Sequence, residues 1–139
     1  MTTMAAQSPS NPSESSFLNF PSTPLGYIAI LAALVTGVLH LVLVPRVLGF
    51  SQTMAILFLL NGLGFIGGLL VYVTRYWRRT FYLVASLYSV ATILALFVFQ
   101  GFSIEAFYMQ GSINPMAVIT KAAELVLAIV TLYLYSNAE

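Results

Sequence analysis

The sequence predicts an all-α membrane protein, a bundle of four transmembrane helices with antiparallel neighbours. Of its 139 residues, 60% are hydrophobic and only 6% are charged, whereas a soluble domain is about a quarter charged. The apolar residues are gathered in four long segments that carry almost no charge. Each segment has about the 20 residues that a helix needs to cross roughly 30 Å of hydrocarbon.

The four segments define one transmembrane domain over residues 24–136. Backbone groups inside lipid must be hydrogen-bonded within their own segment, so each segment should be a helix. We therefore expect helices at 25–44, 51–74, 80–100 and 115–135.

Residues that cap helices stand at or just before the start of each segment. Pro24 and Pro115 follow two of these residues, and proline is favoured at the first helical position. Pro45 and Gly49 are expected to break the chain after the first helix, which leaves a loop of about six residues, typical of antiparallel neighbours. The expected caps are Thr23, Ser51, Thr80 and Asn114.

Residues 1–23 form a polar tail for which we expect disorder. The run 8–16 is rich in serine and proline and has too little apolar surface to fold. No lysine or arginine precedes the first apolar segment, so the basic start of a secretory signal is missing. We therefore expect the tail to be retained and flexible.

The basic residues predict how the chain is oriented in the membrane. Arg75, Arg78 and Arg79 cluster between the second and third segments, whereas only Arg46 lies between the first two. Basic loops are kept on the cytoplasmic side, so we expect a multi-pass membrane protein with both termini in the cytoplasm. The three clustered arginines can also contact anionic lipid headgroups, although a role in topology and anchoring is the simpler interpretation.

Small residues recur at the spacing that lets transmembrane helices approach closely. The first helix carries Ala29, Ala33 and Gly37, and the second carries Gly64 and Gly68. We interpret both stripes as packing inside one bundle. A seam between two copies of the chain is the other interpretation.

The fourth segment contains two charged residues, Lys121 and Glu124, on one helix face. Each would cost about 3 kcal/mol at the bilayer centre if unpaired, so we expect the two to face inward and pair. Counting residues from the outer end of each helix places Glu124 about 13 Å deep and Asn61 about 15 Å deep, so the two lie at a similar depth in the membrane. His40 lies nearer the level of Lys121, so one polar cluster of four residues can form.

This cluster has two interpretations. It can be a polar clamp that fixes how the helices pack, or it can mark a transport or sensing site, as intramembrane ionisable residues often do. A transport path usually needs more than one charged pair, and no other helix contains a charged residue inside the span. The clamp is therefore favoured.

The sequence predicts no catalytic residue, cofactor or metal. His40 is the one histidine, so a haem with two histidine ligands would need a second chain. The chain has no cysteine and no aspartate, which leaves too few ligands for a metal site. A net charge of +1 leaves no basic surface for nucleic acid. We therefore do not expect an enzyme.

Two stretches carry a resemblance to a known group: GVLHL at 37–41 and LFLLNGLGF at 57–65. The chain resembles small uncharacterised four-helix membrane proteins of archaea, especially haloarchaea, and of some actinobacteria. The likeness covers residues 25–135 and omits the tail. It implies four helices in a plasma membrane, and it transfers no functional residue.

The function that we expect is non-enzymatic. The protein would act in the lipid bilayer as an accessory or self-assembling subunit, as a homo-oligomer or within a larger membrane complex. The alternative is a small transporter or channel-like protein that uses the polar cluster of His40, Asn61, Lys121 and Glu124.

Overall fold

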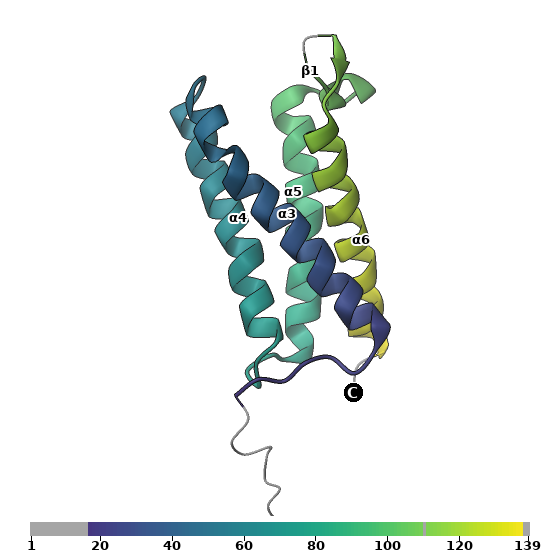
Figure 1. The fold of residues 1–139 in the computed structure, drawn as a ribbon. Coiled ribbons are helices and arrows are strands. Elements are labelled where there is room, and N and C mark those ends of the chain that lie inside the picture. Colours follow the sequence, from purple (N-terminus) through teal and green to yellow (C-terminus); the bar gives the residue numbers. More distant parts are fainter. Residues whose placement is uncertain (1–16, 110, 138–139) are drawn as a thin grey trace, which may run out of the picture.

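A computed structural model describes residues 17–109 and 111–137. Neighbouring helices in the sequence run antiparallel along the bundle (Figure 1). The four helices in this part of the chain are all long and apolar enough to cross a membrane, so the predicted fold class is confirmed and the protein is a membrane protein. They are α3 (Pro24–Leu48), α4 (Gln52–Tyr72), α5 (Arg79–Gln100) and α6 (Pro115–Asn137).

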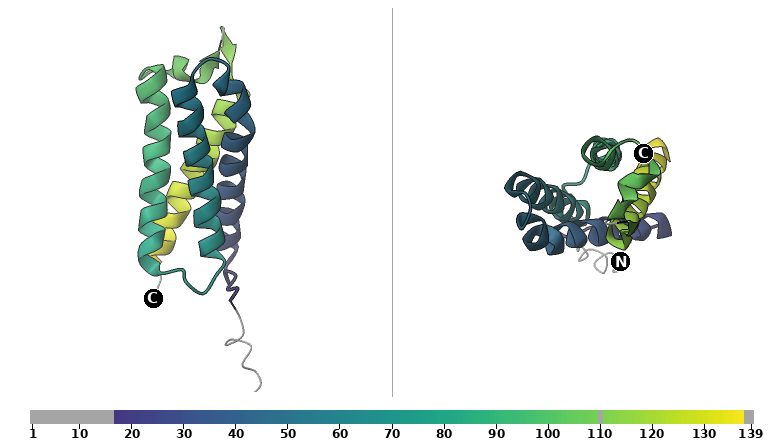
Figure 2. Two further views of the ribbon diagram at one scale, coloured as in Figure 1. Left: turned by 90° about the vertical axis from the view of Figure 1, so that its left-hand side faces the viewer. Right: turned by 90° about the horizontal axis from the view of Figure 1, so that it is seen from above.

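The bundle is open along one side. Helix α3 packs against both α4 and α6, and α6 packs against α5. Although α4 and α5 are consecutive in the chain, they hardly approach each other, as the view from above shows (Figure 2). Side chains of α4 and α5 line the space between these two helices.

Helix α3 is longer than expected because Pro45 does not end it. The helix continues through Pro45 to Leu48, and only 49–51 separate it from α4. A proline removes one backbone hydrogen bond, and near the end of a membrane helix other groups can satisfy the freed carbonyl. The expected break at Pro45 was therefore wrong. The other helices begin and end within two residues of their expected bounds.

Three of the four expected caps are present. Thr23 and Ser51 accept hydrogen bonds from the backbone N–H three residues on, and Asn114 from the N–H two residues on. Thr80 was wrongly expected to cap the third helix and instead lies inside α5. The N-cap of α5 is Arg78, which has extended backbone and makes no side-chain cap bond.

The end of the predicted tail contacts the bundle. The Asn19 N–H donates to the Val73 carbonyl at 2.7 Å, and the Arg75 N–H donates to the Phe17 carbonyl at 2.9 Å. These bonds join the chain before α3 to the loop between α4 and α5, so disorder was wrongly predicted for this part of the tail. Residues 17–19 follow the serine-rich run, and their backbone groups pair with backbone groups at the end of α4 and in the loop after it. The first 16 residues lie outside the described part of the chain.

A short hairpin connects α5 to α6 at the opposite end of the bundle from the α4–α5 loop (Figure 1). It contains a 3₁₀ turn, η2 (Ile104–Phe107), and two antiparallel strands, β1 (Tyr108–Met109) and β2 (Ser112–Ile113). Gly101 and Gly111 have φ angles of +101° and +86°, which glycine adopts without a steric penalty.

The small residues of α3 lie in the core. Ala29 and Ala33 are buried beside Phe65. A Cβ atom added to Gly37 would lie 2.8 Å from a methyl carbon of Ile66. The predicted stripe on α3 therefore faces neighbouring helices of the same bundle.

On α4 the glycine closest to α3 is Gly62, which the spacing pattern did not single out. A Cβ atom there would lie 3.0 Å from the Gly37 carbonyl oxygen. A Cβ on Gly64 would meet the Tyr88 hydroxyl of α5, and one on Gly68 would meet nothing within 4 Å. Gly64 therefore packs inside the bundle as expected, against α5. The expected packing role was wrong for Gly68, which faces the space between α4 and α5.

Candidate functional site

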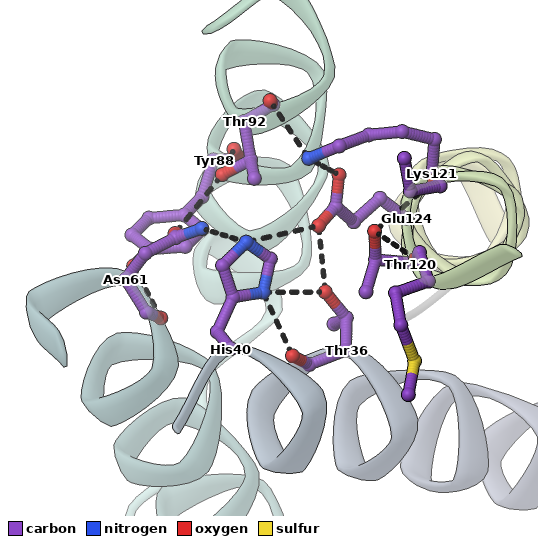
Figure 3. A network of polar contacts seen from close by, with 10 residues as sticks. Thr36, His40, Asn61, Tyr88, Thr92, Thr120, Lys121 and Glu124 are labelled. Atoms are coloured by element: carbon purple, nitrogen blue, oxygen red, sulfur yellow. Dashed lines mark hydrogen bonds and ion pairs between the residues drawn. The ribbon is translucent and has the colours of Figure 1, made fainter. Parts of the chain in front are cut away.

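Side chains from all four helices form a hydrogen-bonded polar network near the middle of the bundle (Figure 3). The structure brings together all four residues of the expected polar cluster and adds three hydroxyl residues. We call this group the central network. Its members are Thr36 and His40 from α3, Asn61 from α4, Tyr88 and Thr92 from α5, and Lys121 and Glu124 from α6.

Glu124 is the most enclosed member of the central network, with an exposed fraction of 0%. The Lys121 ammonium donates to its Oε1 at 2.8 Å, and the Thr36 hydroxyl donates to its Oε2 at 2.6 Å. Both carboxylate oxygens therefore have a donor, as a buried charge requires. The predicted pairing of Lys121 with Glu124 is present.

Lys121 pairs with Glu124 on one side and lines a cavity on the other. Its Nζ also donates to the Thr92 carbonyl at 3.3 Å, and its side chain is 11% exposed. An ammonium group has three N–H donors. Among the described residues two of these donors are used, which leaves one for another acceptor.

The hydrogen bonds of His40 identify its neutral form. Nδ1 lies 2.8 Å from the Thr36 carbonyl oxygen, which can only accept, so Nδ1 carries the hydrogen. Nε2 is then the acceptor and takes a hydrogen bond from the Asn61 amide nitrogen at 3.0 Å. Nε2 is 3.9 Å from the nearer Glu124 oxygen. The ring packs beside Phe58, with centroids 5.0 Å apart.

Asn61 joins α4 to the helices on either side of it. Its amide oxygen accepts from the Thr92 hydroxyl at 3.1 Å, and its backbone carbonyl accepts from the Tyr88 hydroxyl at 3.0 Å. With the bond to His40, the single residue Asn61 connects α3, α4 and α5. It therefore bridges the open side of the bundle.

A cavity of about 770 Å³ lies on the side of the central network that faces the hairpin. We call it the hairpin cavity. His40, Asn61, Thr92 and Lys121 line it, whereas Glu124 does not. Two cationic residues, Arg46 and Lys121, line the cavity, and none of its described lining residues is acidic. Most of the wall is apolar and includes Leu57, Phe58, Ala95, Leu96 and Phe99.

A second cavity, of about 260 Å³, lies toward the loop between α4 and α5. We call it the loop cavity. Tyr88 lines both cavities and stands between them. Apart from Thr131, the hydroxyls of its tyrosines and the indole nitrogen of Trp77, the side chains that line the loop cavity are apolar. Its aromatic residues are Phe65, Tyr72, Trp77, Phe81, Tyr82 and Tyr88.

A protein-family model described as "Family of unknown function (DUF7475)" matches residues 11–135. The chain belongs to the DUF7475 family. Searches of curated proteins and of solved structures each found no match. Membership of DUF7475 therefore gives no function, and the role of the chain has to be inferred from the central network and the two cavities.

Three members of the central network, Thr36, Tyr88 and Thr92, were not expected from the sequence of this DUF7475 member. Thr36 lies four residues before His40, which places the two side chains on one face of α3. That spacing was a usable signal for Thr36. Thr92 and Tyr88 are also four residues apart, on α5, but nothing in the sequence shows that this face meets Asn61.

The three clustered arginines lie at the same end of the bundle as the start of α3 and the end of α6 (Figure 1). All three are exposed. Arg79 donates to the Tyr135 carbonyl at 3.0 Å, and its guanidinium lies 4.6 Å from the centre of the Tyr135 ring. Arg75 donates to the Tyr76 hydroxyl at 3.2 Å. None of the three forms an ion pair within the described residues.

Metal-binding groups are sparse in the described ranges. Within 17–109 and 111–137, no three residues of the types His, Cys, Asp and Glu lie close enough to hold a metal ion. The central network contains one histidine and one carboxylate, and the ammonium of Lys121 and the hydroxyl of Thr36 already occupy both carboxylate oxygens.

Proposed function

We propose that the protein is a non-enzymatic membrane protein that binds an amphipathic organic anion in the hairpin cavity. The observation that carries this proposal is the position of Lys121 at the inner end of a large and mostly apolar cavity. One N–H of its ammonium is left unused by Glu124 and Thr92. A carboxylate or similar anionic group supplies the acceptor for it, and the apolar wall suits a hydrocarbon body.

The charges around the cavity support an anion over a cation. Glu124 balances Lys121 from outside the cavity, because it is fully buried and does not line it. Arg46 adds a second positive charge to the lining, and no described lining residue is acidic. A cationic ligand would meet like charges only.

Two observations favour binding over transport. A transport site that uses Glu124 needs a cavity that reaches it, and the hairpin cavity stops at Lys121. Beyond the central network the loop cavity is almost wholly apolar, so the described residues show no polar path through to the other end. The accessory or self-assembling role expected from the sequence stays a prediction, and ligand binding is compatible with it.

Binding can be measured with octanoate as the probe, using purified protein in nanodiscs of zwitterionic lipid. We expect octanoate to raise the unfolding temperature. Octanol, which has the same chain without the charge, should bind about tenfold more weakly or worse, because a hydrogen bond to a charged group is worth about 1.5–3 kcal/mol. Ala95→Phe fills the cavity wall and should abolish the octanoate effect. Val98→Phe, on the exposed face of α5, is the matched control.

Equal binding of octanoate and octanol to the parent protein would contradict an anion site. An octanoate effect that Ala95→Phe leaves intact would place the probe elsewhere. The comparison of the two probes needs no variant, so it decides the question even if Ala95→Phe fails to fold.

We also propose that both termini lie in the cytoplasm of a plasma-membrane protein. The exposed arginines at the end of the bundle where α3 begins and α6 ends support this orientation. The chain has no native cysteine, so single cysteines can be labelled selectively. In intact cells, a membrane-impermeant maleimide should label Ser112→Cys and leave Ser22→Cys and Thr80→Cys unlabelled. The reverse pattern would invert the orientation.

A further inference from the structure

We propose that the loop cavity is a binding site for an anionic phospholipid of the surrounding bilayer. One acyl chain would enter the cavity, an ester carbonyl would bind Trp77, and the phosphate would bind the clustered arginines. This site is separate from the hairpin cavity, and the proposal does not depend on the anion-binding function.

The loop cavity opens sideways between α4 and α5. Its lining includes exposed residues on both helices, Gly64, Gly68 and Val71 on α4 and Val84 on α5. Because the two helices hardly approach each other, the opening faces the region that the bilayer's hydrocarbon fills. A lipid chain can therefore enter directly from the membrane without crossing water.

The size and lining of the cavity suit part of one acyl chain. Its volume is about 260 Å³, below the roughly 300–1,000 Å³ of sites that enclose a drug-sized molecule. The lining is almost entirely hydrocarbon and aromatic. A chain that lies partly in the cavity and partly in the bilayer matches both properties.

Trp77 lines the loop cavity and carries a hydrogen-bond donor without an acceptor in the described part of the chain. Its indole nitrogen Nε1 is buried and has no hydrogen-bond partner among the described residues. A buried N–H without an acceptor is unfavourable and uncommon in native proteins. The ring is held by Tyr72 and Tyr82, with centroids 4.8 Å and 5.2 Å away. The ester carbonyl of a lipid would supply the missing acceptor.

The arginines next to Trp77 provide positive charge for a phosphate. Arg75, Arg78 and Arg79 are exposed, and the described residues give none of them an anionic partner. Clustered basic residues at a membrane surface attract anionic lipids. In this proposal the acyl chain lies in the apolar cavity, the ester lies beside Trp77 and the phosphate lies beside the arginines.

The fluorescence of Trp77 tests the proposal, because it is the chain's one tryptophan. Phosphatidylglycerol with brominated acyl chains is added to the full-length protein in detergent, with brominated phosphatidylcholine as the comparison. We expect quenching to saturate at one phosphatidylglycerol per chain. Phosphatidylcholine should bind about tenfold more weakly, because its choline cation offsets the negative charge that the arginines attract. Glycerol 3-phosphate, which has the phosphate without the chains, should displace nothing.

Two glycines provide matched variants of the cavity. A Cβ on Gly68 or on Gly67 meets nothing within 4 Å, but only Gly68 lines the cavity. Gly68→Leu should weaken the binding of phosphatidylglycerol about tenfold or more, as read from the quenching titration. The reason is that the leucine side chain would occupy the place of the acyl chain. Gly67→Leu should leave it unchanged. Circular dichroism checks that both variants fold.

Several outcomes would overturn the proposal. Equal quenching by the two lipids would show that the arginines do not select a lipid with net negative charge. Quenching that Gly68→Leu leaves intact would show that the acyl chain does not lie in the loop cavity. If glycerol 3-phosphate displaces the brominated phosphatidylglycerol, the arginines bind a free phosphate compound and not a lipid. If Gly68→Leu abolishes a dimer, measured by native mass spectrometry, while lipid quenching is unchanged, a second copy of the chain covers the cavity. The comparison of the two lipids uses the parent protein, so it tests the proposal even if a variant does not fold.

Discussion

Glu124→Met or Lys121→Met alone should destabilise the protein by about 3–5 kcal/mol, the effect expected when one partner of a buried ion pair is removed. In Glu124→Met the Lys121 ammonium loses its counter-ion and the Thr36 hydroxyl loses its acceptor. In Lys121→Met a carboxylate that is 0% exposed keeps only one hydrogen bond. The double variant strands no charge and should be more stable than either single variant.

A double-mutant cycle on unfolding in detergent measures this coupling. Ile129→Met, on the exposed face of α6, is the control for an added methionine and should unfold like the parent. If both single variants and the double variant are as stable as the parent, the pair does not hold the bundle together. The transport alternative would then gain over ligand binding.

The second large effect is expected at Gly62, where α4 packs closely against α3. A Cβ atom there would lie 2.7 Å from a methyl carbon of Leu41 and 3.0 Å from the Gly37 carbonyl oxygen. The methyl carbon can move, but the carbonyl belongs to the backbone of α3. Gly62→Ala should therefore cost about 1–3 kcal/mol, as overpacked cores do, and Gly62→Val should cost more.

Gly67→Ala is the matched control, because a Cβ at this position on the same helix meets nothing within 4 Å. It should stabilise the protein by up to about 1 kcal/mol, the difference in helix propensity between alanine and glycine. The two alanine variants are therefore expected to shift the unfolding temperature in opposite directions. A Gly62→Ala variant as stable as Gly67→Ala would show that α3 and α4 can separate without loss.

The four helices were predictable because a membrane restricts the chain to very few structures. An apolar segment of about 20 residues must satisfy its own backbone groups, so length and composition specify a helix. The same physics explains the failure at Pro45. In a soluble helix an interior proline commonly kinks or ends the helix. In a membrane other groups can satisfy the freed carbonyl, and α3 continues to Leu48.

The rotation of each helix about its axis was less predictable than its position. The glycine pair at Gly64 and Gly68 has the expected spacing, but Gly62 meets α3 instead. Spacing identifies residues that share a face, and it does not show which neighbour that face meets. That choice depends on the packing of all four helices together.

The polar cluster was predictable from depth and from the cost of unpaired charge. His40, Asn61, Lys121 and Glu124 could each be placed by counting residues along a helix. Thr92 carried no such signal, because its hydroxyl also bonds to the Tyr88 carbonyl four residues before it, as threonines commonly do inside helices. The cavities were not predictable, since they exist only because α4 and α5 hardly approach each other.

The uneven linkage of α4 to α5 gives the bundle a mechanical asymmetry. At the loop end the connecting chain and the contact between the Tyr72 and Tyr82 hydroxyls, 3.3 Å apart, join the two helices. Halfway along, Asn61 joins them by two hydrogen bonds. From Asn61 to the hairpin the described residues contain no further hydrogen bond between the two helices. Separating α4 from α5 at the hairpin end would therefore break no hydrogen bond between the described residues of these two helices, whereas separating them at Asn61 would break two.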